Sequence, residues 1–135
     1  MKNISRIFAM LLALAIITPL LSSCEKSPNV YLNAMVSKQN VPNGVRVYIK
    51  LVQENGEADD PTLYEGDAAF TSSIATVVIE DIVPKTYRLY SFIDMNKNAG
   101  LNDPMPDGGD FVTETDVVMT EDRVISMPES YWFPF

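Results

Sequence analysis

The sequence contains no histidine and only one cysteine among its 135 residues. Nucleophilic catalysis by Ser–His or Cys–His pairs needs an imidazole base, so those hydrolase classes are excluded. Zinc sites built on histidine and cysteine are excluded too, and a single cysteine cannot form a disulfide within the chain. The carboxylate pairs Glu80–Asp81 and Glu114–Asp116 remain as candidate acids and bases. Charges at strand ends or on solvent faces explain them more simply, and we expect no enzyme.

Basic residues are also scarce, with 10 Lys and Arg against 18 Asp and Glu, a formal net charge of −8. An acidic surface repels the phosphates of nucleic acids and the headgroups of anionic lipids. We therefore expect no nucleic-acid partner. The same surface favours solubility and the binding of divalent cations.

Long apolar runs are absent except for one at the start, residues 7–21, IFAMLLALAIITPLL. Lys2 and Arg6 precede it, and only Thr18 and Pro19 interrupt it. A helix of about 15 residues is too short to cross a bilayer core of about 30 Å, but it matches the apolar core of a signal peptide.

This run ends in Leu21, Ser22, Ser23 and Cys24. The four residues resemble the lipobox of bacterial lipoproteins, in which an aliphatic residue and two small residues precede the cysteine that is lipidated and becomes the first residue. The resemblance implies that residues 1–23 are a cleaved signal peptide and that lipid on Cys24 provides the contact with a membrane. It also implies a location in the cell envelope, with the outer membrane favoured, facing the periplasm or the exterior. The alternative is that Cys24 is a buried or unpaired thiol.

The mature chain would then have 112 residues, enough for one domain with a single core. Residues 24–29 form a short polar tether, whose segment EKSPN reaches at most about 18 Å when extended. Residues 30–135 form the folded domain. Loss of Lys2 and Arg6 with the signal peptide leaves eight basic against 18 acidic residues, a formal charge of −10.

Beyond the tether, helical signals are nearly absent and short strand-like runs recur between turn residues. Alternation of apolar and polar residues is strongest in VYLNAMVS from Val30 and VRVYIKLV from Val45, and Asn43–Gly44 marks the turn between them. Further runs are FTSSIATVVIEDI, YRLYSFID, FVTETDVVM and RVISM. The pattern predicts an all-β domain, a single antiparallel sandwich of about seven strands.

The run IEDIVPKTYRLYSFIDMNKN resembles the pattern of transthyretin-like, or carboxypeptidase regulatory-like, β-sandwich domains. In that pattern a strand leads into Leu-x-Pro-Gly-x-Tyr-x-Leu and then into a strand that ends in Asp. Ile82, Pro84, Tyr87 and Leu89 fit it, and Lys85 replaces the glycine. The resemblance implies an immunoglobulin-like or transthyretin-like sandwich outside the cytoplasm, and it implies no particular activity.

The same run continues into a loop rich in Asp, Asn and Gly, FIDMNKNAGLNDPMPDGGD. Its Asp-x-Asn-x-Asn spacing is one with which loops wrap Ca²⁺, because alternate side chains can point their oxygens at one centre. The glycine and the bidentate glutamate of an EF-hand loop are missing. The predicted calcium ligands are Asp94, Asn96, Asn98, Asn102 and Asp103. The alternative is a series of polar turns, in which Asn and Asp bond to the neighbouring backbone.

Aromatic residues gather at the C-terminus, ESYWFPF. Tyr131, Trp132 and Phe133 are predicted to bind a ligand, as a stacking platform for sugar rings or as a contact with a partner. The alternative is a last strand or tail pinned across the sandwich, with Trp132 in the core. The same choice, between an exposed patch and a second packed face, applies to the outward-facing residues Tyr48, Tyr90 and Phe92.

The sequence thus predicts a membrane-anchored lipoprotein of the bacterial envelope that acts as a non-enzymatic binding or accessory module. One alternative is a glycan-binding component of a surface uptake system, with the C-terminal aromatics as its contact. Another is a structural envelope subunit that adds a strand to a partner protein. Calcium is the one cofactor predicted, and an envelope protein or a glycan is the predicted partner.

Overall fold

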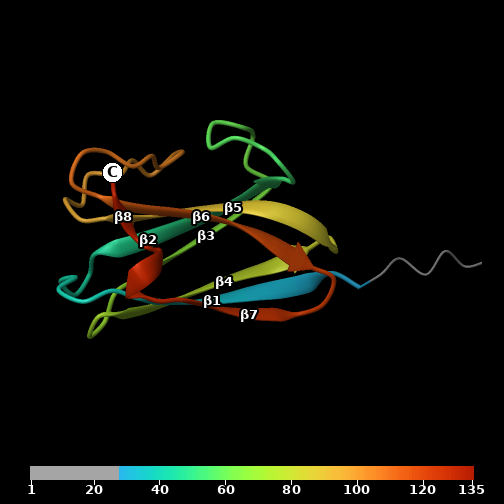
Figure 1. Cartoon of the computed structure of the whole chain (residues 1–135), viewed down its shortest axis with the longest axis horizontal. Coiled ribbons are helices and arrows are strands. Elements are labelled where there is room, and N and C mark those ends of the chain that lie inside the picture. Colours follow the sequence, from blue (N-terminus) through green and yellow to red (C-terminus); the bar gives the residue numbers. More distant parts are fainter. Residues whose placement is uncertain (1–27) are drawn as a thin grey trace, which may run out of the picture.

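The computed structural model describes residues 28–135, and the predicted signal peptide, residues 1–23, and Cys24 lie outside the described residues. Residues 28–135 fold into two β-sheets packed face to face (Figure 1). The predicted all-β sandwich is therefore confirmed. No helix within the described part of the chain is long and apolar enough to cross a membrane.

One sheet has three strands in the order β4-β1-β7, and the other has five in the order β3-β2-β5-β6-β8. The strands are β1 (Val30–Ser37), β2 (Arg46–Gln53), β3 (Tyr64–Ala69), β4 (Ile74–Ile82), β5 (Lys85–Asp94), β6 (Phe111–Met119), β7 (Arg123–Met127) and β8 (Phe133–Pro134), with a short 3₁₀ helix η1 (Glu129–Tyr131) before β8. Seven strands of five residues or more agree with the expected number.

One strand pair departs from the expected antiparallel pattern. β7 runs parallel to β1, with Leu32 opposite Arg123 and Val36 opposite Met127. The turn after β6 carries the chain from the five-stranded sheet to the three-stranded sheet, so β7 meets β1 without a hairpin between them. A parallel pair cannot be joined by a tight hairpin, and this crossing between sheets provides the connection.

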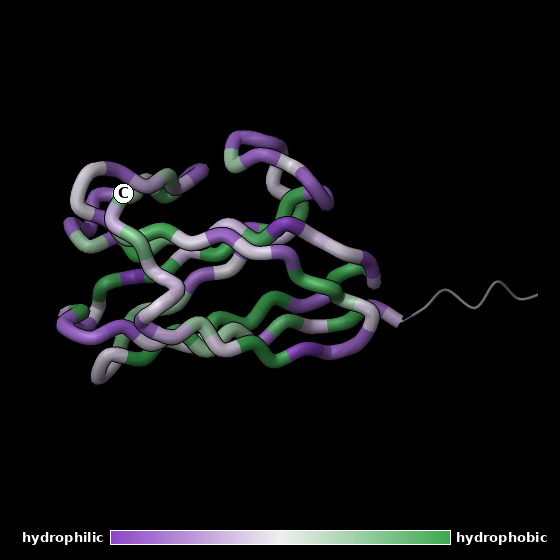
Figure 2. The backbone as a smooth tube through the Cα atoms, in the orientation of Figure 1, coloured by the Kyte–Doolittle hydropathy of each residue, from purple (hydrophilic) through white to green (hydrophobic). Residues whose placement is uncertain are grey.

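The core lies between the two sheets, where the alternation of apolar residues in the strands places them. Leu32 of β1, Ile49 and Leu51 of β2, and Leu89 and Ile93 of β5 are all fully buried. Each such side chain contributes roughly 1.5–3 kcal/mol when it leaves water. Figure 2 shows the hydrophobic residues along the strands and the hydrophilic residues concentrated in the loops.

Strand β3 was not expected, because its sequence YEGDAA is poor in strand-forming residues. Its place beside β2 depends instead on close packing against β4. A Cβ added at Gly66 would lie 2.9 Å from the side chain of Ile79 and 3.0 Å from that of Val77. Glycine therefore allows the backbone of β3 to approach β4, and tertiary contact outweighs the local propensity.

Tyr87 fixes the connection between β4 and β5. Its hydroxyl donates to the carbonyl of Val83 at 2.6 Å, and the backbone N–H of Val83 donates to the hydroxyl of Tyr64 at 3.1 Å. The two rings meet edge to face with centroids 5.6 Å apart. Burial, reinforced by Tyr64, raises the pKa of Tyr87, so its hydroxyl remains a donor at any physiological pH.

Candidate functional site

A groove with a volume of about 830 Å³ lies on the outer face of the five-stranded sheet. Its walls are two long connections, residues 54–63 between β2 and β3 and residues 95–110 between β5 and β6. They leave the sheet at opposite ends and rise above the same face, so that they stand opposite one another (Figure 1). The volume falls within the range of sites for small ligands.

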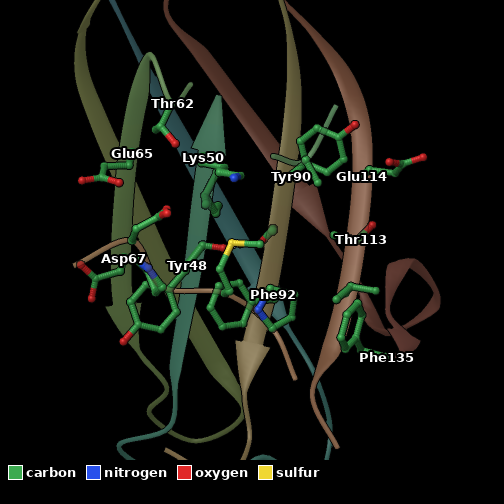
Figure 3. Close-up of a pocket in the computed structure, with 18 of the residues that line it drawn as sticks. Tyr48, Lys50, Thr62, Glu65, Asp67, Tyr90, Phe92, Thr113, Glu114 and Phe135 are labelled. Carbon is green, nitrogen blue, oxygen red and sulfur yellow. The ribbon is translucent and has the colours of Figure 1, made fainter. Parts of the chain in front are cut away.

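The centre of the groove floor is aromatic. Strand register places one outward-facing residue from each of five strands in a row, namely Asp67, Tyr48, Phe92, Val112 and Phe133. The rings of Tyr48 and Phe92 stack with centroids 4.9 Å apart and an interplanar angle of 18° (Figure 3). Phe92 is nearly buried by its neighbours, whereas Tyr48 stays partly open to the groove. The row is thus a flat platform between the two loops.

The second row of the floor is polar. It consists of Glu65, Lys50, Tyr90 and Glu114. The hydroxyl of Tyr90 donates to the carbonyl of Gly56 at 2.9 Å, which ties the β2–β3 loop to the floor. Glu114 accepts from Arg88 at 2.9 Å, so its charge is already balanced. Glu65 and Lys50 face the groove beside the aromatic platform (Figure 3).

Apolar side chains form much of the wall. Leu101 is fully exposed at the tip of the β5–β6 loop, and Met105 of the same loop is about half exposed. Phe133 and Phe135 are also more than half exposed, at the far edge of the sheet. Exposed large apolar residues are common singly, but their concentration around a hollow is typical of binding surfaces. The prolines Pro104 and Pro106 complete this part of the wall.

Asp94 holds the root of the β5–β6 loop. Its carboxylate is buried and accepts the backbone N–H groups of Asn98 at 3.1 Å and Ala99 at 3.2 Å. The side-chain oxygen of Asn96 also accepts the N–H of Asn98, at 3.2 Å. Both carboxylate oxygens of Asp94 thus accept hydrogen bonds from the turn that they stabilise.

Asp110 closes the same loop from its other end. Its buried carboxylate accepts the backbone N–H groups of Met95 at 2.9 Å and Asp107 at 3.0 Å. Asp107 in turn accepts from the side-chain amides of Asn96 at 2.6 Å and Asn98 at 2.5 Å. Hydrogen bonds therefore join the first and the last residues of the loop, and the wall of the groove has a fixed base.

The structure brings together only part of the predicted calcium set. Asp94, Asn96 and Asn98 meet at the loop root, whereas Asn102 and Asp103 lie in the exposed part of the loop, and Asp103 lines the groove. Within residues 28–135, no three side chains of Asp, Glu, Cys or His are placed to hold a metal ion. The hydrogen bonds of the root are those of polar turns, and calcium binding stays a prediction.

The C-terminal aromatic residues divide between the core and the groove. Trp132 is buried in the core, and its Nε1 donates to the carbonyl of Met127 at 3.4 Å. This burial agrees with the alternative that placed Trp132 in the core, and not with a stacking platform, because alternate residues of an extended chain point to opposite faces. Phe133 points outward and lines the groove, together with Phe135, which was not predicted. Tyr131 is exposed on η1 and does not line the groove.

The C-terminal segment is held in place by Glu129. Its carboxylate accepts from the ammonium of Lys38 and from the backbone N–H of Gln39, the latter at 2.7 Å. Lys38 is largely buried and lies over the ring of Phe111, 4.1 Å from its centroid. The hydrogen bond from Lys38, followed by that from Gln39, lowers the pKa of Glu129. This anchor positions the residues that follow against the edge of β6.

Tyr48 remains protonated in the groove. Its partial burial raises the pKa of the hydroxyl, and the carboxylates of Asp94 and Asp67 raise it further. Arg46 acts in the opposite direction and is paired with Asp67. The hydroxyl of Tyr48 is therefore available as a hydrogen-bond donor beside a stacking surface.

The groove becomes acidic toward β3. There the two loops approach each other over a smaller adjoining hollow that shares Lys50, Glu65 and Asp103 with the main groove. Asp59 and Asp60 of the β2–β3 loop line it as well. This end thus gathers four carboxylates around one ammonium.

Comparison of the chain with protein-family models, with curated proteins and with solved structures found no match. The arguments for function therefore come from the groove itself. The sequence pattern had placed Tyr48, Tyr90 and Phe92 on outward faces, and they form the floor. The sequence pattern did not predict that Leu101 and Met105 line the groove. Their apolar side chains within a polar loop were a signal that could have been used.

Proposed function

We propose that this chain is a lipid-anchored, non-enzymatic binding module of the bacterial cell envelope, and that its ligand lies in the groove of the five-stranded sheet. One observation carries the proposal: large apolar side chains, Leu101, Met105, Phe133 and Phe135, remain exposed around a hollow of about 830 Å³. A ligand that covers them removes apolar surface from water, which favours binding.

The rigidity of the groove supports the same proposal. Its floor consists of paired strands, and its walls are tied down by hydrogen bonds at Asp94 and Asp110 on one side and at Tyr90 on the other. A site that is formed before the ligand arrives loses little conformational entropy on binding. Binding by a preformed groove therefore needs no ordering of either loop.

The groove proposal can be tested with the neutral apolar dye Nile red, whose fluorescence rises in apolar surroundings. We expect a fluorescence increase with the wild-type protein and a loss of most of it in Leu101→Ser and Phe135→Ser, because both residues line the groove. Val124→Ser removes an apolar residue that is as exposed as Phe135 from the other outer face, and it should leave the signal unchanged. A similar loss in all three variants would mean that the dye does not report on the groove.

The envelope location rests on the resemblance of Leu21–Cys24 to a lipobox. The tether is short, since the first strand begins at Val30, so the lipid would hold the domain close to the membrane. Cys24→Ala should move the protein from the membrane fraction to the soluble fraction. Ser23→Ala keeps a small residue before the cysteine and should remain with the membrane. A Cys24→Ala protein that still sediments with membranes would contradict the proposal.

A glycan is the second candidate ligand, favoured by the flat stack of Tyr48 and Phe92 beside Glu65 and Lys50. Sugar rings pack their C–H faces on aromatic rings while carboxylates accept bonds from their hydroxyls. Binding to a glycan array that is lost in Tyr48→Ala would support it, and a wild-type protein that binds no glycan would dismiss it. A structural role would instead be supported by co-purification of a stoichiometric envelope protein.

A further inference from the structure

We propose that the occupant of the groove is an extended segment of a partner protein that presents apolar side chains toward one end and lysine or arginine toward the other. This inference rests on the proposed function and adds the chemistry of the ligand. It follows from the two chemically different ends of the groove.

One end of the groove is apolar. The central row of the floor runs from β3 across to β8, and its last members are Val112 and Phe133, with Phe135 beside them. Five neighbouring strands are separated by four spacings of about 4.8 Å, so the row is about 19 Å long. That length corresponds to about six residues of extended chain. An extended segment laid across the strands therefore fits the floor from edge to edge.

The other end is acidic. Four carboxylates and a single ammonium leave three negative charges in excess there. The lining residues with these charges are Asp59, Asp60, Glu65, Asp103 and Lys50. A hollow lined by one sign of charge attracts the opposite sign, so it favours an ammonium or a guanidinium and opposes carboxylates and phosphates.

The other charges on this face do not compensate for the excess. Arg46 is paired with Asp67, and Arg88 is paired with both Glu114 and Asp116. The guanidinium groups of Arg46 and Arg88 are therefore engaged by carboxylates outside the acidic end. The formal charge of the whole chain is −8, and this charge also steers a basic partner toward the protein.

A protein segment satisfies both ends better than the other ligand classes do. A lipid with an anionic headgroup would place its charge against carboxylates. A neutral sugar would use the Tyr48–Phe92 stack, but it would leave aliphatic surface at Leu101 and Met105 in water. An extended peptide provides apolar side chains at one end and basic side chains at the other, and its backbone can bond to polar groups of the walls.

Three dye-labelled synthetic peptides test the inference by fluorescence anisotropy. Each has the same soluble spacer and four alternating leucine and phenylalanine residues, followed by two lysines, two serines or two glutamates. We expect the lysine peptide to bind at least about tenfold more tightly than the serine peptide, and the glutamate peptide to bind most weakly. The preference should shrink as salt rises from about 50 to 500 mM, because salt screens exposed charges.

Substitutions in the protein locate the effect. Glu65→Gln combined with Asp103→Asn should weaken the lysine peptide about five- to tenfold and leave the serine peptide unchanged. Glu80→Gln combined with Glu121→Gln removes the same amount of charge at exposed positions outside the groove lining and is the matched control. Equal losses in the two double variants would overturn a specific acidic end.

The outcomes separate this inference from the proposed function. Equal binding of the three peptides would overturn the charge preference and leave the groove as a binding site. Binding of octyltrimethylammonium in the absence of any peptide binding would overturn the protein segment in favour of a small cationic amphiphile. Failure of every probe, Nile red included, would overturn the proposed function itself.

Discussion

The two outer faces of the sandwich are built from similar strands but have become different surfaces. On the three-stranded sheet, the outward-facing residues Met35, Val78 and Val124 are about half exposed or more. On the five-stranded sheet, Phe92 occupies an equivalent outward position and is only 6% exposed. Alternation in the strands produced outward apolar residues on both faces, so alternation alone did not make the groove.

The difference comes from the connections between strands. Only β2–β3 and β5–β6 join two strands of the same sheet, and both pairs belong to the five-stranded sheet. Every other connection within the described chain crosses from one sheet to the other. A loop that starts and ends on one sheet is free to fold over its outer face, and both of these long loops do so. Sites of this kind are loops positioned by a rigid scaffold.

The largest expected effect is the loss of stability when a side chain on the loop-covered face of the five-stranded sheet is truncated. Phe92→Ala should lower the free energy of unfolding by about 3 kcal/mol, because it leaves a cavity beneath the loops. Val78→Ala on the bare face should cost less than about 0.5 kcal/mol, because its side chain is half in water. Urea unfolding of both variants measures the difference. Equal costs would show that the two faces are covered alike.

The next effect is on the wall of the groove. Asp94→Ala should cost about 2 kcal/mol, because the N–H groups of Asn98 and Ala99 lose a buried acceptor. Asp103→Ala, in the exposed part of the same loop, should change stability by less than about 0.5 kcal/mol. For both variants, urea unfolding measures the stability and Nile red fluorescence reports on the groove. A stable Asp94→Ala protein with an intact groove would mean that the root does not hold the wall.

A smaller effect, confined to the C-terminal segment, depends on pH. The folded state lowers the pKa of Glu129 below the ordinary value of about 4.3, because Lys38 and Gln39 favour its charged form. Its contribution to stability is therefore present above that ordinary value and is lost as the pH falls through the lowered pKa. Between pH 5 and pH 3, we expect wild type to lose more stability than Glu129→Gln.

The comparison for Glu129 should be made at each pH by urea unfolding. Glu121→Gln, an exposed carboxylate in the turn before β7, is the control and should follow the wild-type pH profile. If Glu129→Gln also follows it, the contact with Lys38 contributes nothing to the fold.

The smallest expected effect is that of calcium. A weak site with a dissociation constant of about 10⁻³ to 10⁻⁴ M would add about 0.4–1.4 kcal/mol at 1 mM calcium. The carboxylates of Asp94 and Asp110 already accept backbone N–H groups, so we expect the same melting temperature in 1 mM calcium and in chelator. A reproducible increase with calcium would support the predicted site and give the loop root a second role.

Much of the fold could be predicted because it depends on local patterns. The alternation in β1, β2 and β5 identified the strands and their inward faces, and the outward positions of Tyr48, Tyr90 and Phe92 followed from the same period. β3 could not be found in this way, because its residues are weak strand formers and its position depends on contact between Gly66 and β4. β8 is only two residues long and depends on its pairing with β6.

The candidate site was harder to predict. The sequence drew attention to the loop after Asp94 for its oxygens, whereas the structure uses those oxygens to brace the wall and turns Leu101 and Met105 toward a hollow. It also grouped the C-terminal aromatics, although Trp132 lies in the core and Phe133 in the groove. Neighbouring residues of an extended segment face opposite ways, so proximity in sequence did not mean proximity in the site.

The amino-acid sequence by itself determined strands such as β1, β2 and β5 and their buried faces, because these depend on residue type and a period of two, and it determined the acidic charge. It also determined which chemistries of nucleophilic catalysis the chain lacks. Only the tertiary structure decided that two loops from opposite ends of one sheet stand over the same face, and that Tyr48, Phe92, Val112 and Phe133 form one row. The reason is register: residues far apart in the chain become neighbours only when strands pair, and pairing is set by the core that the two sheets bury together.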